Sequence, residues 1–180
     1  MENSNLLLIY LTALLLLLGV AAFFVVRQVF RTRRIESTLS RLQTKLTKEK
    51  GTAKEYYELA SLLLDKKLYT QAILYLQQAL KQLGDDEEEN AALIYNALGY
   101  AYFAQEQYDL AIRNYKEALK IIPEYVTAMN NLGHSYERKQ LVAQAVDMYE
   151  SALELDPKNS TAKRRRESLR KRLNTVEAQE

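Results

Sequence analysis

The side chains of this 180-residue chain that could do chemistry are aromatic, amide and charged groups, and their types favour recognition over catalysis. The sequence has no cysteine and one histidine, His134, so it cannot build a zinc or haem centre by itself. It contains no set of nucleophile, base and orienting group, and no glycine-rich phosphate loop. We therefore expect no catalytic residue, no metal ligand, no cofactor and no enzyme activity.

The candidate recognition residues fall at fixed spacings, as the lining of one groove would. Tyr100 and Phe103 are its apolar centre, because aromatic side chains flanked by polar ones are common anchors for protein partners. Either ring could instead pack inside the molecule, against an N-terminal helix or a neighbouring unit, and both interpretations stay open. His134 could sense pH or bind a ligand, or be an ordinary surface side chain. The predicted partner-binding groove comprises Tyr57, Leu64, Asn96, Tyr100, Phe103, Asn130 and His134.

A repeat of 34 residues positions these side chains. Leu98, Gly99, Tyr102, Ala111, Tyr115, Ala118 and Pro123 recur as Leu132, Gly133, Tyr136, Ala145, Tyr149, Ala152 and Pro157. Two helices cross closely only where a small residue faces a large one, so a glycine inside the first helix predicts close contact with a neighbour. The period and the residue types are those of the tetratricopeptide repeat, a helix-turn-helix unit.

An earlier and more degenerate copy precedes these two. Tyr56, Leu59, Tyr69, Ala72 and Ala79 occupy the corresponding places, and Ala72 lies 39 residues before Ala111, which predicts a five-residue insertion in the acidic stretch 84–90. Three units are about the minimum for a stable stack. Eight tyrosines fall on landmark positions and are predicted to be core: Tyr56, Tyr69, Tyr95, Tyr102, Tyr108, Tyr115, Tyr136 and Tyr149.

One known ligand of this repeat class is not expected here. Co-chaperone members hold a peptide carboxylate with lysine, arginine and asparagine side chains, whereas the equivalent places in this chain hold Tyr57, Ser61, Ala97, Thr127 and Asn131. We therefore expect no binding of heat-shock-protein tails.

The N-terminal run 6–26 is uncharged and, as a helix, would span about 31 Å, which matches the hydrocarbon core of a bilayer. A cleaved signal peptide is the alternative, but no basic residue precedes the run. The basic flank of Arg27, Arg31, Arg33 and Arg34 follows it, which favours a retained anchor whose short N-terminus, residues 1–5, faces outward and whose repeats face the cytosol or stroma.

The stretch 27–51 is predicted to leave the membrane as a basic amphipathic helix. Its apolar residues Ile35, Leu39, Leu42 and Leu46 follow a helical spacing, and they could either pack on the first repeat or accompany lysine and arginine side chains that contact anionic lipid. Thr52 and Glu55 then form the pattern of a capping box.

Charge is segregated along the chain, whose net charge is only +2. Residues 51–159 hold 10 basic and 17 acidic side chains, so this body should not bind nucleic acid. The five acids at 85–89 are interpreted as solvated helix-start residues, with a basic partner as the alternative. Residues 160–173 are predicted to be a basic capping helix, with contact to a membrane surface or a nucleic acid as the alternative, and 174–180 a disordered tail.

Together these patterns predict an all-α protein: a transmembrane helix (6–26), a juxtamembrane helix (27–51), repeat 1 with its insertion (52–91), repeat 2 (92–125), repeat 3 (126–159), a capping helix (160–173) and a tail (174–180).

The order of these segments resembles a known family. The leucine-rich anchor, the segment 19–24, the residues Arg27-Gln28-Val29-Phe30 and three repeats are similar to the membrane-anchored tetratricopeptide proteins of cyanobacteria and algal plastids that are implicated in photosystem I assembly. The resemblance implies a single-pass thylakoid protein that binds photosystem I subunits or assembly intermediates. A bacterial inner-membrane scaffold for another complex is the alternative, and an enzyme is the third choice.

Overall fold

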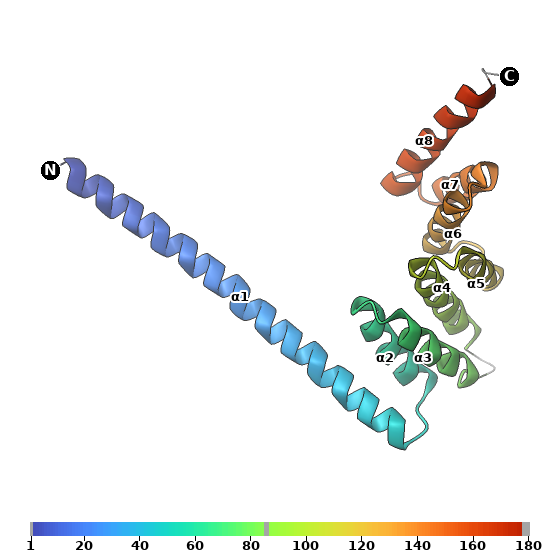
Figure 1. Cartoon of the computed structure of the whole chain (residues 1–180), viewed down its shortest axis with the longest axis horizontal. Helices are drawn as coiled ribbons and strands as arrows, with labels where there is room; N and C mark the ends of the chain where they lie inside the picture. Colours follow the sequence, from blue (N-terminus) through green and yellow to red (C-terminus); the bar gives the residue numbers. More distant parts are fainter. Residues whose placement is uncertain (1, 85–86, 178–180) are drawn as a thin grey trace. The chain divides into compact units, whose positions relative to one another are not determined.

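The computed structural model describes residues 2–84 and 87–177, with side chains for 10–84 and 87–172. All regular structure within these ranges is helical, which confirms the predicted all-α class. The helices, labelled in Figure 1, are α1 (Glu2–Lys48), α2 (Ala53–Asp65), α3 (Tyr69–Lys81), α4 (Glu88–Ala104), α5 (Tyr108–Ile121), α6 (Val126–Arg138), α7 (Val142–Leu155) and α8 (Ser160–Glu177). Helix α1 forms one unit and α2 to α8 form a second.

Helix α1 joins the two predicted N-terminal segments without a break and ends at Lys48, before Gly51. Among the described residues it is the helix long and apolar enough to cross a membrane, with a mean hydropathy of 2.3 in its most apolar window and none of that window buried. A helix of this length and composition is what a membrane anchor requires.

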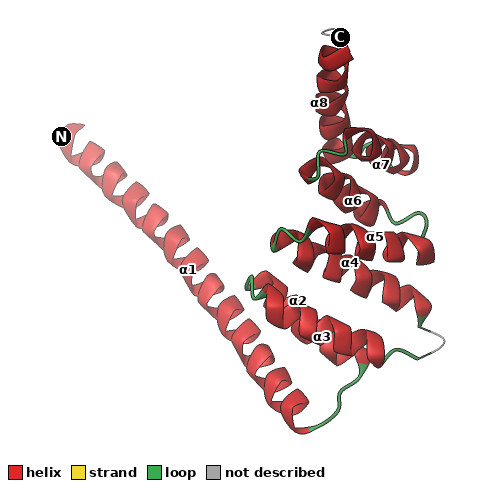
Figure 2. Cartoon of the chain, turned by 45° about the vertical axis from the view of Figure 1, so that its right-hand side comes forward, coloured by secondary structure: helices red, strands yellow, loops and turns green. Residues whose placement is uncertain are grey.

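Helices α2 to α7 form three antiparallel hairpins. Helix α2 packs on α3, α4 on α5 and α6 on α7, and successive hairpins meet through α3 with α4 and α5 with α6. Figure 2 shows these pairs stacked in chain order, with α8 against α7. The first helices of the hairpins therefore lie along one side of the stack, where α4 contacts both α2 and α6.

The small and large landmarks meet as the repeat predicts. A methyl group placed on Gly99 of α4 would lie 2.5 Å from Cε1 of Tyr115 on α5, and one on Gly133 of α6 would lie 2.9 Å from Cζ of Tyr149 on α7. Both rings are almost completely buried. Each glycine thus allows the tyrosine of the second helix to fill the space between the two helices of its hairpin.

The eight landmark tyrosines are not equally covered. Four of them, Tyr56, Tyr115, Tyr136 and Tyr149, are buried, as predicted. The other four, Tyr69, Tyr95, Tyr102 and Tyr108, are half-buried at the edges of the hairpins. Their hydroxyl ends can therefore reach solvent while their rings pack, as is common for tyrosine.

The turn inside each hairpin has one conformation. Lys67, Glu106 and Gln140 occupy equivalent places in the three repeats, and each has a φ of 61°. The amide of each donates to a carbonyl three residues earlier, from Lys67 N to Leu64 O, from Glu106 N to Phe103 O and from Gln140 N to Glu137 O, at 2.9 Å in every case. A left-handed residue in this place ends the first helix and reverses the chain.

The capping box that starts the first repeat is present. The Thr52 amide donates to Glu55 Oε2 at 3.1 Å, and the Glu55 amide donates to Thr52 Oγ1 at 3.3 Å. The insertion before α4 includes Asp85 and Asp86, which lie outside the described residues; its described end supplies Glu88 and Glu89 to the first turn of α4.

Helix α8 covers the last hairpin with Ala162 and Leu169, which are both buried. The predicted tail was wrong for residues 174–177, because α8 continues to Glu177. No proline or glycine follows Leu173, so nothing in the sequence stops the helix there. Residues 178–180 of that prediction lie outside the described part.

Candidate protein-interaction groove

The candidate site is one face of the hairpin stack, which we call the groove face. It consists of five positions on each of α2, α4 and α6 that the repeat register directs away from the landmark core, and none of the fifteen side chains is buried. It contains all seven predicted groove residues. The members are Lys54, Tyr57, Ser61, Leu64, Asp65, Leu93, Asn96, Tyr100, Phe103, Ala104, Thr127, Asn130, His134, Glu137 and Arg138.

Tyr100 is the most accessible aromatic residue of the groove face, with 45% of its surface exposed. Its ring meets Tyr69 edge to face, with centroids 6.4 Å apart. Partial burial raises the pKa of its phenol, and the neighbouring Tyr69 and Asp65 raise it further. The phenol therefore stays protonated near neutral pH. Leu93, about two turns earlier on α4, is 39% exposed. The second repeat thus exposes apolar surface on the groove face.

Phe103 is partly used inside the stack. Its ring lies 5.4 Å from that of Tyr108 in the same hairpin and 4.6 Å from that of His134 in the next. The side chain also packs against the core cluster of the third repeat. Phe103 is partly buried and joins repeats 2 and 3, so the interpretation that it packs against a neighbouring unit is confirmed, whereas its binding to a partner stays a prediction.

Amide side chains line the groove face beside these rings. Asn131 Nδ2 donates to Asn96 Oδ1 at 3.1 Å, which links α6 to α4. The Oδ1 atom of Asn130 is buried and accepts no hydrogen bond from any residue that the structure describes. A buried carbonyl oxygen without a donor is costly, and a partner cannot reach this atom in this conformation.

Tyr125 was not among the sequence candidates, although it borders the same face. Burial raises the pKa of its phenol, the nearby Tyr57 raises it further, and a hydrogen bond with Asn96 lowers it. Its side chain therefore lies close to predicted groove residues of both α2 and α4. Its place directly before α6, two residues after Pro123, is the signal that could have identified it, because a turn residue between repeats borders the first helices.

The charged end of the groove face is tied to the capping helix. Arg165 Nη1 of α8 donates to both carboxylate oxygens of Glu137 at 3.1 Å, and the Tyr149 hydroxyl donates to Glu137 Oε1 at 2.5 Å. Burial and the bond to Glu137 raise the pKa of the Tyr149 phenol far above its usual value. Glu137 is thereby engaged within the molecule and is not free for a partner.

His134 lies half-buried between Phe103 and this charged cluster. Burial lowers the pKa of its imidazole, Arg165 and Arg138 lower it further, and Glu137 opposes them. The side chain is therefore neutral at neutral pH. It can accept or donate one hydrogen bond without bringing a charge to the groove face.

At the other end, α2 and the start of α4 enclose a hollow of about 350 Å³. Its lining includes Tyr57 and Leu93 together with the polar side chains of Lys54, Glu87 and Asn90. The hollow is continuous with the groove face, since three of that face's members line it. It can receive an uncharged side chain of a partner.

The five places that bind a carboxylate in co-chaperones carry no cation here. Ala97 is buried, and Asn131 is bonded to Asn96. Tyr57, Ser61 and Thr127 offer only hydroxyl groups. The prediction that heat-shock-protein tails do not bind has not been tested, but these contacts agree with it. Among the described residues, no group of three acidic or histidine side chains could hold a metal ion.

Comparison with family models identifies the repeats. Residues 48–87 and 126–159 match the model described as tetratricopeptide repeat, and residues 99–140 match a second model described as TPR repeat. These segments contain the first and third hairpins and the second from Gly99 onward, so the tetratricopeptide repeat read from the sequence is confirmed.

Two relatives extend the likeness to plastid lineages. The chain is 32% identical over 169 residues to the uncharacterized protein ycf37 of Pyropia yezoensis, which covers 92% of this chain and 95% of that protein. It is 39% identical over 122 residues to the tetratricopeptide repeat domain-containing protein PYG7, chloroplastic, of Arabidopsis thaliana. That match covers 68% of this chain but only 40% of the Arabidopsis protein, so the chain spans less than half of that relative.

A solved structure shows the same fold. The Arabidopsis OM64 TPR domain superposes with a TM-score of 0.62 at 22% identity, covering 67% of this chain and 96% of that domain. At this level of identity the likeness concerns the helical arrangement alone.

Proposed function

Because the chain belongs to the ycf37 family of tetratricopeptide repeat proteins, we propose that it is a membrane-anchored scaffold that assists the assembly or stability of photosystem I at the thylakoid membrane. That the repeats form a protein-interaction scaffold follows from the fold and the family. The anchor, the thylakoid location and the photosystem I clients are the proposal. Its support is the resemblance of anchor and repeats described above, together with relatives from plastid lineages.

The observation that carries the binding role is the exposed aromatic surface at the centre of the groove face. The fold does not require an aromatic ring at Tyr100, because this position is not a landmark of the repeat. The side chain is nevertheless aromatic, and 45% of its surface is exposed. Leu93, two turns earlier on the same helix and 39% exposed, adds an apolar contact. A face of this kind suits an uncharged segment of a protein, bound by ring contacts and a few amide hydrogen bonds.

The anchor would raise the effective concentration of the groove face near its clients. If the run 6–26 spans the thylakoid membrane, the basic residues Arg27, Arg31, Arg33 and Arg34 keep the repeats on the cytosolic or stromal side. Clients embedded in the same membrane then meet the groove face at a high effective concentration. A weak and reversible interaction is sufficient for an assembly factor under these conditions.

The test compares variants of the tagged full-length protein, isolated in mild detergent from native membranes of a photosynthetic host. We expect photosystem I subunits to accompany the wild type. The double variant Tyr100→Ala with Leu93→Ala should retain less than about a tenth of them, because truncating anchor residues costs about 1–2 kcal/mol each. These two are preferred to Phe103, whose loss would also disturb the contact with His134.

A matched control is available on the opposite side of the stack. Leu74 of α3 is 59% exposed and lies outside the groove face, so Leu74→Ala should leave the recovered subunits unchanged. Equal recovery with the double variant and the wild type would reject the groove face as the client site. Recovery of no photosystem I subunit with the wild type would reject the proposed client.

A further inference from the structure

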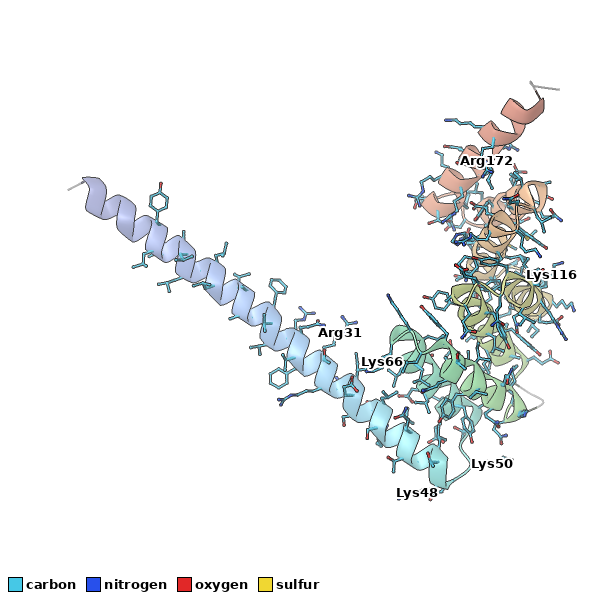
Figure 3. All side chains as sticks on the ribbon, in the orientation of Figure 1. Arg31, Lys48, Lys50, Lys66, Lys116 and Arg172 are labelled. Carbon is cyan, nitrogen blue, oxygen red and sulfur yellow. The ribbon has the colours of Figure 1, made fainter. Side chains whose placement is uncertain are left out.

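The exposed side of α8 is strongly basic. Between Ser160 and Arg172 the helix carries seven lysine or arginine side chains and one acid, Glu167. Figure 3 shows the side chains of this helix, with Arg172 labelled. The surface contrasts with residues 51–159, where acids outnumber bases by 17 to 10.

Only part of this charge is needed to attach α8 to the third repeat. Arg165 pairs with Glu137, Arg170 pairs with Glu150, and Ala162 and Leu169 are buried against the stack. Lys163, Arg164 and Arg172 are exposed, and within the described part of the chain no carboxylate lies within ion-pair distance of them. These cations have no role in holding the helix.

The cations outside the packed side form a row. Lys163 and Arg164 precede Lys171 and Arg172 by eight residues, which in a straight helix is a separation of about 12 Å along its outward side. Glu167 and Ser168, both exposed, lie between the two pairs. These side chains project from the outward side of one helix, so they do not converge to enclose a single small anion.

We propose that this row contacts the anionic headgroups of the membrane in which the chain is anchored, so that the repeat unit is held to the lipid surface at its C-terminal end. The proposal rests on the membrane anchor of the proposed function. A bilayer surface with anionic lipids is flat and negatively charged, and it attracts polybasic helices without requiring a pocket.

The composition of the row favours lipid over other acidic partners. A protein interface of useful affinity has an apolar centre, whereas the exposed residues of α8 from Lys163 to Arg172 are all polar. A single-stranded nucleic acid would require aromatic side chains for stacking, and α8 has none. The apolar run of α1 and its basic flank already indicate that the chain meets a membrane.

The absence of cysteine from the sequence makes a direct test straightforward. Ser168→Cys introduces a single thiol between the two cation pairs, and it can carry a fluorophore. The full-length labelled protein is reconstituted into vesicles of phosphatidylcholine alone, or with about one third phosphatidylglycerol, each containing a headgroup-attached quencher. Resistance to alkaline extraction first establishes that the anchor has inserted.

We expect the label to be quenched at least threefold more strongly in the anionic vesicles than in the neutral ones. Raising the salt to 1 M should abolish the difference, because the screening length falls to about 3 Å. The variant Lys163→Gln, Arg164→Gln, Lys171→Gln and Arg172→Gln should lose the difference as well. The control Lys116→Gln with Lys120→Gln, on α5, should keep it.

Each contrary result overturns a distinct statement. Equal quenching in both vesicles, or quenching unchanged by the four glutamines, overturns the lipid contact while the anchor stands. A normal anchor with unchanged quenching but loss of photosystem I subunits in the four-glutamine variant would show that the row binds an acidic protein instead. A chain that alkaline treatment extracts overturns the membrane anchor and the lipid contact together.

Discussion

The second and third repeats have the same framework but use the groove face differently. Gly99 and Tyr115 in repeat 2 correspond to Gly133 and Tyr149 in repeat 3, and both pairs pack in the same way. At the next equivalent position, repeat 2 exposes Tyr100, whereas repeat 3 holds His134 half-buried beside the cluster that ties down α8. The landmark residues thus determine the packing of each hairpin. The residues between the landmarks determine whether its groove-face side chains stay exposed or make contacts within the chain.

Among the variants that test the shared framework, substitution of its glycines should cause the largest loss of stability. Gly99→Ala places a methyl group 2.5 to 2.8 Å from three ring carbons of Tyr115, which is buried and cannot move away. We expect a loss of about 2–3 kcal/mol in the free energy of unfolding, even though alanine favours helix more than glycine does. Urea unfolding of the full chain in detergent, followed by tyrosine circular dichroism, measures it.

The matched variant Gly133→Ala should cost less, because its nearest contacts with Tyr149 are 2.9 to 3.3 Å. If both substitutions were neutral, or if Gly133→Ala were the more harmful, close packing of glycine on tyrosine would not be what fixes the two hairpins.

A smaller loss of stability should distinguish Tyr149 from its counterpart Tyr115. Tyr149→Phe removes the hydrogen bond to Glu137, which holds α8 through Arg165, and bonds to charged groups are worth about 1.5 kcal/mol or more. Tyr115→Phe should change stability by less than about 0.5 kcal/mol, because its hydroxyl has no hydrogen-bond partner among the described residues. Equal losses of unfolding free energy in the two variants would contradict the special role of repeat 3 in holding α8.

The smallest expected effect is on the pH dependence of stability, to which His134, the counterpart of Tyr100 in repeat 3, contributes. The folded protein lowers the pKa of His134 below its ordinary value of 6.5, so the unfolded chain takes up the proton first as pH falls. The contribution of His134 to stability is therefore present above pH 6.5 and is lost as pH falls through the lowered pKa. Unfolding free energies measured between pH 7.5 and 5 should fall less steeply for His134→Gln than for the wild type, and identical slopes would argue against this assignment.

The hairpins and their register were predictable because steric rules act at fixed offsets. Seven landmarks separated by 34 residues defined repeats 2 and 3, and the glycine and tyrosine contacts follow from them. The capping box at Thr52 was readable for a similar reason, since it joins residues three apart. Features that depend on one repeat and its own geometry can be read from a single sequence.

Features that depend on contacts between distant residues could not be predicted. Whether Phe103 faces a partner or its neighbours depends on His134, which lies 31 positions later, and the two rings prove to be 4.6 Å apart. The pairing of Glu137 with Arg165 joins a hairpin to a helix that has no place in the repeat pattern. Tyr125 lies in a turn, where periodicity gives no direction for a side chain.

The three left-handed turn residues have a consequence for how the family can vary. Lys67, Glu106 and Gln140 differ in charge and size, and yet each has the same backbone angle. The hairpins must therefore impose this angle, and a short side chain is not a condition for closing them. Substitutions there should alter stability only slightly. Glu106 pairs with Arg138 of the groove face, so Lys67 and Gln140 are the exposed corners suitable for affinity tags, dyes or cross-linkers that leave that face untouched.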